Sequence, residues 1–199
     1  MALPMQMTRK HLLRVGAAGG AAFALPGGVA LAGTTATAPT DGDLAYLRLL
    51  IGAELLALDF QTRALAARKL GPAAATFRRS LADERAHYAS LAKLLSDAGQ
   101  PPATSADVDF TYPRGSFGSR AAIGHLAWRV ETLLLGAYLG AIGNVEAAEF
   151  RLPIGQIAAN EAQHLSALAP LLGRGAVGRA FPRALAMSAA SDQLDAFES

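Results

Sequence analysis

Two copies of one pattern of acids and histidine stand 77 residues apart in this chain of 199 residues. Each copy has a glutamate and, 30 residues further on, a Glu-x-x-His motif: Glu54, Glu84 and His87, then Glu131, Glu161 and His164. Residues i and i+3 share one face of a helix, so each motif points a carboxylate and an imidazole the same way. Six such groups that meet at one place would form a metal site.

The types of these six groups narrow the choice of metal. Four carboxylates and two imidazoles suit iron or manganese better than zinc, which takes fewer ligands and often thiolate. The chain has no cysteine, which excludes disulfides, thiolate sites and a lipoprotein anchor. The alternative is a decayed site, in which the same buried groups form a hydrogen-bonded network without metal.

The repeat also predicts the fold. Residues around the motifs repeat with them, for example Leu91 and Leu95 with Leu168 and Leu172. An internal repeat fixes the architecture, and here the repeat unit is a helical hairpin. The chain is therefore predicted to be all-α, an antiparallel four-helix bundle whose two hairpins are related by a pseudo-two-fold axis.

Helix start and stop signals place the four helices. Asp41 or Asp43 can cap the first, and Gly71-Pro72 ends it. The helices are expected at residues 41–70, 72–98, 119 to 143 or somewhat beyond, and from Pro153 to about Pro170. The turn before the fourth helix is open, because the repeat places it near residue 148 whereas Gly143-Asn144 suggests an earlier break.

The remaining segments connect, precede or follow these helices. Residues 101–118, rich in Pro, Gly, Ser and Asp, indicate one long crossover between helices two and three. Residues 1–38 are predicted to be an export signal and linker, residues 41–173 the bundle, and residues 174–199 a tail. Within the tail, residues 184–197 are expected to form a short amphipathic helix that closes one end of the bundle.

The first residues have the pattern of an export signal. A basic start with Arg9, Lys10 and Arg14 precedes an apolar run at residues 15–25 that is short for a membrane span. The stretch is similar to a twin-arginine motif with Lys10 in place of the second arginine, so the general secretory route stays open. The mature protein is expected outside the cytoplasm; the alternative is an uncleaved N-terminal anchor.

The charge and composition of the chain limit its expected binding partners. The net charge is +2, but removing three leader residues from 18 basic ones leaves 15 against 16 acidic residues, a net charge of −1. No basic patch with interleaved aromatic residues appears, so nucleic acid is not expected as a partner. The expected partners are metal ions, with O₂ or peroxide as candidate reactants. No stable membrane span is expected in the mature form, and a homo-oligomer stays open.

With these residues in place, the chain resembles the ferritin-like superfamily and, more narrowly, exported bacterial ferritin-like domain proteins related to desiccation-related proteins. The resemblance covers about residues 43–173, the leader and the tail. It implies a dinuclear centre of two iron ions, or alternatively manganese, with no other cofactor. By this analogy Glu54 and Glu131 are terminal ligands and Glu84 and Glu161 bridge the metals. His87 and His164 each bind one metal, and no catalytic residue is implied beyond the ligands.

Residues beside the ligands are harder to assign. Gln61 and Tyr138 occupy equivalent positions, seven residues past Glu54 and Glu131. They are either groups that orient the ligands or ordinary core residues. Asp83 and Asn160 precede the second acid of each copy by one residue, so they point either away from the site or toward a ligand of a neighbouring helix, and they are not assigned to the site.

Three functions from different classes follow. The first is an oxidase-type enzyme, in which the site oxidises ferrous iron or consumes O₂ or peroxide. The second is a metal-binding or stress-protective protein without turnover, and the third is a purely structural bundle. Redox-active metal binding is favoured, because buried ionisable groups are costly in a core unless they are coordinated or paired.

Overall fold

The computed structural model describes residues 38–198. The predicted export signal therefore lies outside the described residues, apart from its last position. The described part contains five α-helices and no strand. The helices are α2 (Asp41–Ala66), α3 (Ala74–Asp97), α4 (Arg120–Asn144), α5 (Ala148–Leu168) and α6 (Met187–Asp195). Two 3₁₀ turns, η1 (Gly71–Ala73) and η2 (Ala169–Leu172), begin or extend the long helices.

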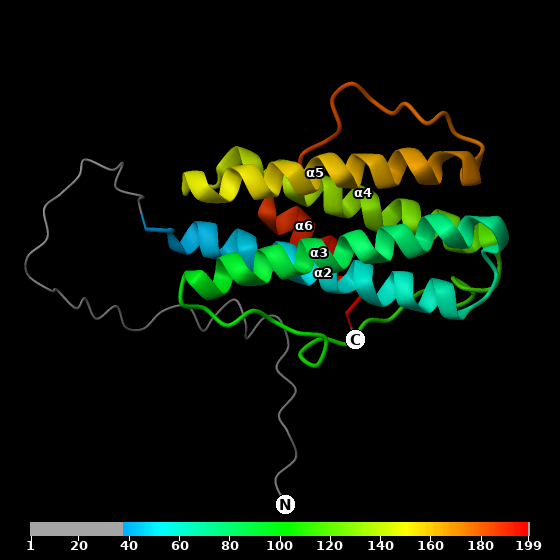
Figure 1. The fold of residues 1–199 in the computed structure, drawn as a ribbon, viewed down its shortest axis with the longest axis horizontal. Coiled ribbons are helices and arrows are strands. Elements are labelled where there is room, and N and C mark those ends of the chain that lie inside the picture. Colours follow the sequence, from blue (N-terminus) through cyan, green and yellow to red (C-terminus); the bar gives the residue numbers. More distant parts are fainter. Residues whose placement is uncertain (1–37, 199) are drawn as a thin grey trace, which may run out of the picture.

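Four of these helices form a bundle of two antiparallel hairpins. Helix α2 packs on α3, α4 packs on α5, and α2 and α4 join the hairpins (Figure 1). The crossover between α3 and α4 runs back along the outside of the bundle (Figure 1). The predicted all-α bundle, with its two-hairpin repeat and long crossover, is confirmed.

The start of α2 differs from the prediction in its capping residue. Thr40, not Asp41 or Asp43, is the N-cap, and its hydroxyl accepts the Asp43 N–H. The Asp43 carboxylate accepts the Thr40 N–H in return, which completes a capping box. It also accepts the backbone N–H of Glu146 at 2.6 Å. Asp43 thereby ties the start of α2 to the loop that leads into α5.

Other helix ends also differ from the expected positions. Helix α2 ends at Ala66 rather than near residue 70, and Pro72 lies in the turn η1 before α3 begins at Ala74. Helix α5 begins at Ala148, as the repeat indicates, so the expectation that Pro153 opens the helix was wrong. Pro153 lies inside α5 and removes one helical hydrogen bond there.

The tail covers a side of the bundle instead of closing its end. Helix α6 packs on both α2 and α4 (Figure 1). The chain before it passes so close to α4 that a Cβ on Gly140 would lie 1.9 Å from the Leu185 carbonyl oxygen. The Leu185 N–H donates to the Gly136 carbonyl at 2.9 Å. Glycine at both positions lets this segment pack directly on the helix backbone.

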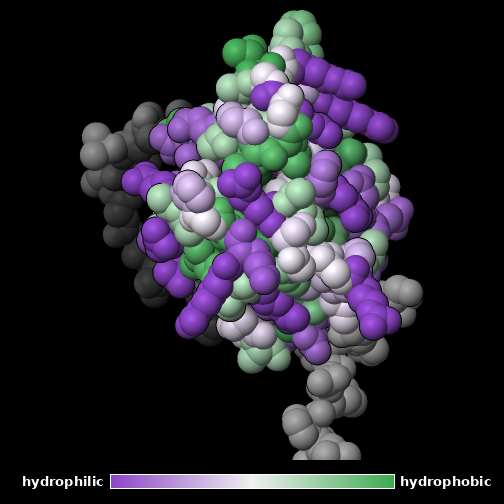
Figure 2. Space-filling view, turned by 90° about the vertical axis from the view of Figure 1, so that its right-hand side faces the viewer, coloured by the Kyte–Doolittle hydropathy of each residue, from purple (hydrophilic) through white to green (hydrophobic). Residues whose placement is uncertain are grey.

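Two further sides of the bundle carry covering segments. The crossover lies against α2 and α3, where the Tyr88 hydroxyl donates to the Ala103 carbonyl and the Tyr112 hydroxyl to Asp59. Residues 174–185 lie over α4 and α5, with the Arg174 guanidinium 4.4 Å from the centre of the Trp128 ring. The end of the bundle at the α2–α3 turn is dominated by hydrophilic side chains (Figure 2). No helix among residues 38–198 is long and apolar enough to cross a membrane.

Candidate metal centre

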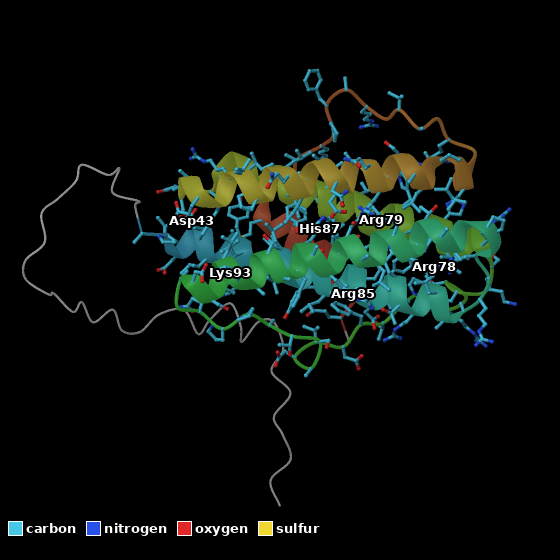
Figure 3. The ribbon with its side chains drawn as sticks, in the orientation of Figure 1. Asp43, Arg78, Arg79, Arg85, His87 and Lys93 are labelled. Carbon is cyan, nitrogen blue, oxygen red and sulfur yellow. The ribbon has the colours of Figure 1, made fainter. Side chains whose placement is uncertain are left out.

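All six predicted ligands lie together in the interior of the bundle, and each of its four long helices contributes. Helix α2 brings Glu54, α4 brings Glu131, and α3 and α5 each bring a Glu-x-x-His pair. The four glutamates are 0% exposed and the two histidines 8%. Figure 3 shows His87 on the part of α3 that faces α5.

The His87 imidazole stands among three carboxylates. Its Nδ1 lies 3.2 Å from Glu84 Oε2 on the same helix and 3.0 Å from Glu161 Oε1 on α5. The Oε1 atom of Glu54 is 3.8 Å away. One nitrogen therefore faces oxygens from three helices, an arrangement typical of a metal ligand.

His164 repeats this arrangement in the second half. Its Nδ1 lies 3.1 Å from Glu84 Oε1, 3.4 Å from Glu131 Oε2 and 3.4 Å from Glu161 Oε2. The two imidazoles are 6.1 Å apart between ring centres.

The six residues divide into two sets of four that share two members. One set is Glu54, Glu84, His87 and Glu161, and the other is Glu84, Glu131, Glu161 and His164. Within each set, the candidate ligand atoms lie within 4.8 Å of one another. Glu84 and Glu161 belong to both sets, as two bridging carboxylates would. We call the first set the His87 half and the second the His164 half.

A second group of side chains holds the carboxylates in place. The Tyr138 hydroxyl of α4 donates to Glu54 of α2. In the equivalent position of the repeat, the Gln61 amide of α2 donates to Glu131 of α4 at 3.1 Å. Gln61 and Tyr138 are thus polar partners of the terminal carboxylates rather than ordinary core residues.

Two residues that sequence reasoning did not assign also contact the site. The Ser80 hydroxyl donates to Glu84 at 3.3 Å and receives the Gln61 amide at 2.9 Å. The Asp83 carboxylate lies 3.5 Å from His164 Nε2, the nitrogen away from the centre. Spacing could have indicated Ser80, because residues i−4 and i share a helix face. Asp83 contacts a ligand of the neighbouring helix, which spacing within α3 does not reveal.

The electrostatics of the centre separate its acids into two kinds. Burial, together with the charges of Glu84 and Glu161, raises the pKa of Glu54 and of Glu131 well above the usual range. Burial would also raise the pKa of Glu84, but the imidazoles of His164 and His87 lower it to about 2. Without metal, the terminal carboxyls therefore keep their protons to a higher pH than an ordinary glutamate does, whereas Glu84 ionises more readily.

The imidazoles respond to the same carboxylates. Burial lowers the pKa of His87, but Glu161 and Glu84 outweigh burial and raise it to about 9. Burial also lowers the pKa of His164, but Glu131, Glu161 and Glu84 outweigh burial and raise that pKa above the pKa of His87. A metal ion has to displace protons from these groups, since only deprotonated groups are ligands.

Several buried atoms of the centre lack hydrogen-bond partners among the described residues. They include Oε2 of Glu54, Oε2 of Glu131 and both carboxylate oxygens of Glu161. Both ring nitrogens of His164 lie near carboxylate oxygens, but the geometry of these contacts is not that of a hydrogen bond. Buried polar atoms are costly when unpartnered, and metal ligation would satisfy these. Four carboxylates and two imidazoles fit such a role.

Comparison with known proteins agrees with this geometry. The pattern of one family, described as the ferritin-like domain, matches residues 42–174. This is most of the chain and includes the four long helices except for the first residue of α2, so the protein belongs to the ferritin-like domain family. A search of the curated proteins found no match. The resemblance to the ferritin-like superfamily is thereby confirmed, while the narrower relation to exported, desiccation-related proteins stays a prediction.

Proposed function

We propose that this protein holds a dinuclear iron centre, with manganese as the alternative, and that the centre is redox-active toward ferrous iron, O₂ or peroxide. The division of the ligands into two sets that share Glu84 and Glu161 carries this proposal. Each half would hold one ion with its own terminal glutamate and histidine. Such a metal pair supplies reversible one-electron changes at two adjacent ions, and carboxylates can hold both oxidation states.

The chain's own residues would keep the centre intact during those changes. Tyr138 and Gln61 orient the terminal carboxylates by donating hydrogen bonds, and Ser80 does the same for Glu84. All four glutamates are buried, so the ions would be held away from the protein surface. With peroxide as the oxidant, such a centre would supply two electrons, which together with two protons convert one peroxide into two waters.

We also propose that the mature protein works outside the cytoplasm. The basic start and apolar run of the leader support this proposal. Copper and zinc compete strongly for nitrogen and oxygen ligands, so folding and metal loading before export would favour iron or manganese. Fractionation of the source cells tests location, and a full-length protein confined to the cytoplasm would contradict export.

The test of the centre uses anaerobic loading followed by exposure to an oxidant. The purified protein is loaded with ferrous iron, its metal content is measured, and absorbance is recorded after O₂ or peroxide is added. We expect about two ions per chain and fast oxidation, because each half offers a full ligand set. Glu161→Gln should abolish both. Glu149→Gln, an exposed position on the same helix, should leave both unchanged.

The outcomes separate the candidate functions. Binding of two ions without accelerated oxidation would favour the metal-binding or stress-protective protein. Absence of binding, with an unchanged melting temperature on addition of iron or manganese, would favour the decayed site.

A further inference from the structure

The two halves of the centre differ in what lies beside them. A pocket of about 520 Å³ opens between α3 and α5 on the His164 half. Its buried lining residues include Gln61, Ser80 and His164. His164 is a candidate ligand, and the other two donate hydrogen bonds to candidate ligands. The inner end of the pocket therefore borders the centre.

The outer end of the pocket lies on the side of the bundle without a covering segment. Its exposed lining residues include Arg79, Gln163 and Ala167, on α3 and α5. Figure 3 places Arg79 on the same side of α3 as His87, toward α5. In Figure 1 this side faces the viewer, and no segment of residues 38–198 crosses it. The pocket is thus open to solvent on this side, whereas the other three sides of the bundle are covered by the crossover, by α6 and by residues 174–185.

Two of the residues that line the pocket have a buried amide oxygen without a protein partner. Oε1 of Gln61 and Oδ1 of Asn160 are buried without a hydrogen bond among the described residues. Asp83 adds a carboxylate that bridges to Arg79 at 3.0 Å and lies 3.5 Å from His164 Nε2. Amide and carboxylate oxygens are the ligands of hard divalent cations and of their bound water. The wall suits the passage of a hydrated divalent cation.

The repeat provides an internal comparison. The positions equivalent to Gln61, Ser80 and Thr76 are Tyr138, Ile157 and Pro153. Tyr138 is 0% exposed and Ile157 5%. Where the His164 half has small polar groups beside its ligands, the His87 half has an aromatic ring and a branched apolar side chain.

We propose that this pocket is the entry route for divalent cations, and that the centre fills from its His164 half. This inference rests on the proposed function, because it supplies the route by which the metal arrives. A cation would pass Asp83 and the oxygens of Asn160 and Gln61, and would then meet His164 and the shared carboxylates. The ion of the His87 half would reach its place through the shared ligands.

The test measures how fast metal enters, with Co²⁺ as the probe in stopped-flow absorbance on the full chain. Two variants obstruct the route without touching a ligand: Ala167→Trp by size and Gln163→Lys by charge. Their matched controls are the repeat-equivalent exposed positions on α3, Ser90→Trp and Ala86→Lys. Melting temperature and the number of Co²⁺ ions bound at equilibrium are measured for every variant, so that a folding defect is recognised.

We expect Ala167→Trp to lose the fast phase of loading. Gln163→Lys should load about tenfold or more slowly at low salt and recover at high salt, because added positive charge repels the cation. Both controls should load like the wild type, and all four variants should bind two ions at equilibrium. Unchanged rates in the two pocket variants, or equal slowing in the controls, would overturn the route. A wild type that binds no Co²⁺, Fe²⁺ or Mn²⁺ would instead overturn the proposed function and the route with it.

Discussion

The His87 half and the His164 half have the same ligands but different neighbours. The terminal glutamate, the shared glutamates and the histidine correspond at every position of the repeat. Around them, Tyr138 replaces Gln61, Ile157 replaces Ser80 and Asn160 replaces Asp83. Bonds to two metals would require the same set of groups in each half, whereas hydrogen bonding and access to the centre leave room for change. Differences between the halves therefore indicate where function has become specialised.

The largest effect should come from breaking the sharing of ligands between the halves. Glu84→Ala removes a carboxylate from both sets, whereas Glu131→Ala removes one from the His164 half only. Loss of one buried charged partner costs about 3–5 kcal/mol, or roughly 10²–10⁴-fold in affinity. Calorimetric titration with Co²⁺ should find almost no binding in Glu84→Ala and about one ion in Glu131→Ala. Equal stoichiometry in the two variants would show that Glu84 is not shared.

The next effect concerns the metal-free protein and pH. The pKa of His87 is raised to about 9 in the folded state, so its contribution to stability is complete below its ordinary pKa of about 6.5. That contribution, up to about 3 kcal/mol, is lost as pH rises from about 6.5 to 9. Glu54 and Glu131 act in the same direction, because their pKa values are also raised.

Melting curves of the chelator-treated protein check this. We expect the melting temperature to fall by roughly 6–12 °C across that range, and His87→Gln should make the fall smaller. Added metal should reverse the trend, because it binds the deprotonated groups. A metal-free melting temperature that rises between pH 6.5 and 9 would contradict the protonation pattern of the centre.

Much of this comparison could be predicted from the sequence, because the ligands obey local rules. The i, i+3 spacing and the 77-residue repeat place six groups at one level of four helices. Each of these groups, once buried, needs a polar partner or a metal. The start of α2 was assigned less well. Thr40 and Asp43 have the spacing of a capping box, yet only the backbone shows that Thr40 is the cap and Asp43 its partner.

The surroundings of the centre depend on contacts that no local pattern reports. Residues 174–185 have no helical periodicity, and contacts such as that of Arg174 with Trp128 and that of Leu185 with Gly140 place them along α4. Asp83 reaches a ligand on another helix. The pocket exists because covering segments lie on three sides and leave the α3–α5 side open. Such features follow from packing over long sequence separations.

A smaller effect should distinguish the hydrogen bonds to the two terminal glutamates. Tyr138→Phe removes the donor to Glu54, and Gln61→Leu removes the donor to Glu131. A buried acceptor left without its donor costs about 1–3 kcal/mol. Loss of such a supporting group typically weakens metal binding about 10–100-fold.

The effects of the two hydrogen bonds can be measured separately in the variant Glu131→Ala, which is expected to bind one ion. In that background only the His87 half binds, so Tyr138→Phe should weaken Co²⁺ binding and Gln61→Leu should not. Tyr88→Phe, which removes a hydroxyl bonded to the crossover, is the control for loss of a tyrosine hydroxyl. Equal weakening by Tyr138→Phe and Gln61→Leu would mean that the two halves are not independent.

The smallest effect should come from making the halves alike at the position beside the second acid. Asp83→Asn gives α3 the residue that α5 has at the equivalent position of the repeat, Asn160. The 3.5 Å approach to His164 Nε2 is long, and the Asp83 side chain is 20% exposed and shared with Arg79. Loss of the Asp83 carboxylate should therefore weaken Co²⁺ binding by about tenfold or less, the low end for a group that orients a ligand.

The measurement compares Co²⁺ affinity in two one-ion backgrounds. With Glu54→Ala, only the His164 half binds, and Asp83→Asn should weaken it several-fold because an amide is a weaker acceptor for the imidazole N–H than a carboxylate. With Glu131→Ala, only the His87 half binds, and Asp83→Asn should have no effect. An effect of Asp83→Asn on the His87 half would show that Asp83 acts on the whole centre and not on His164 alone.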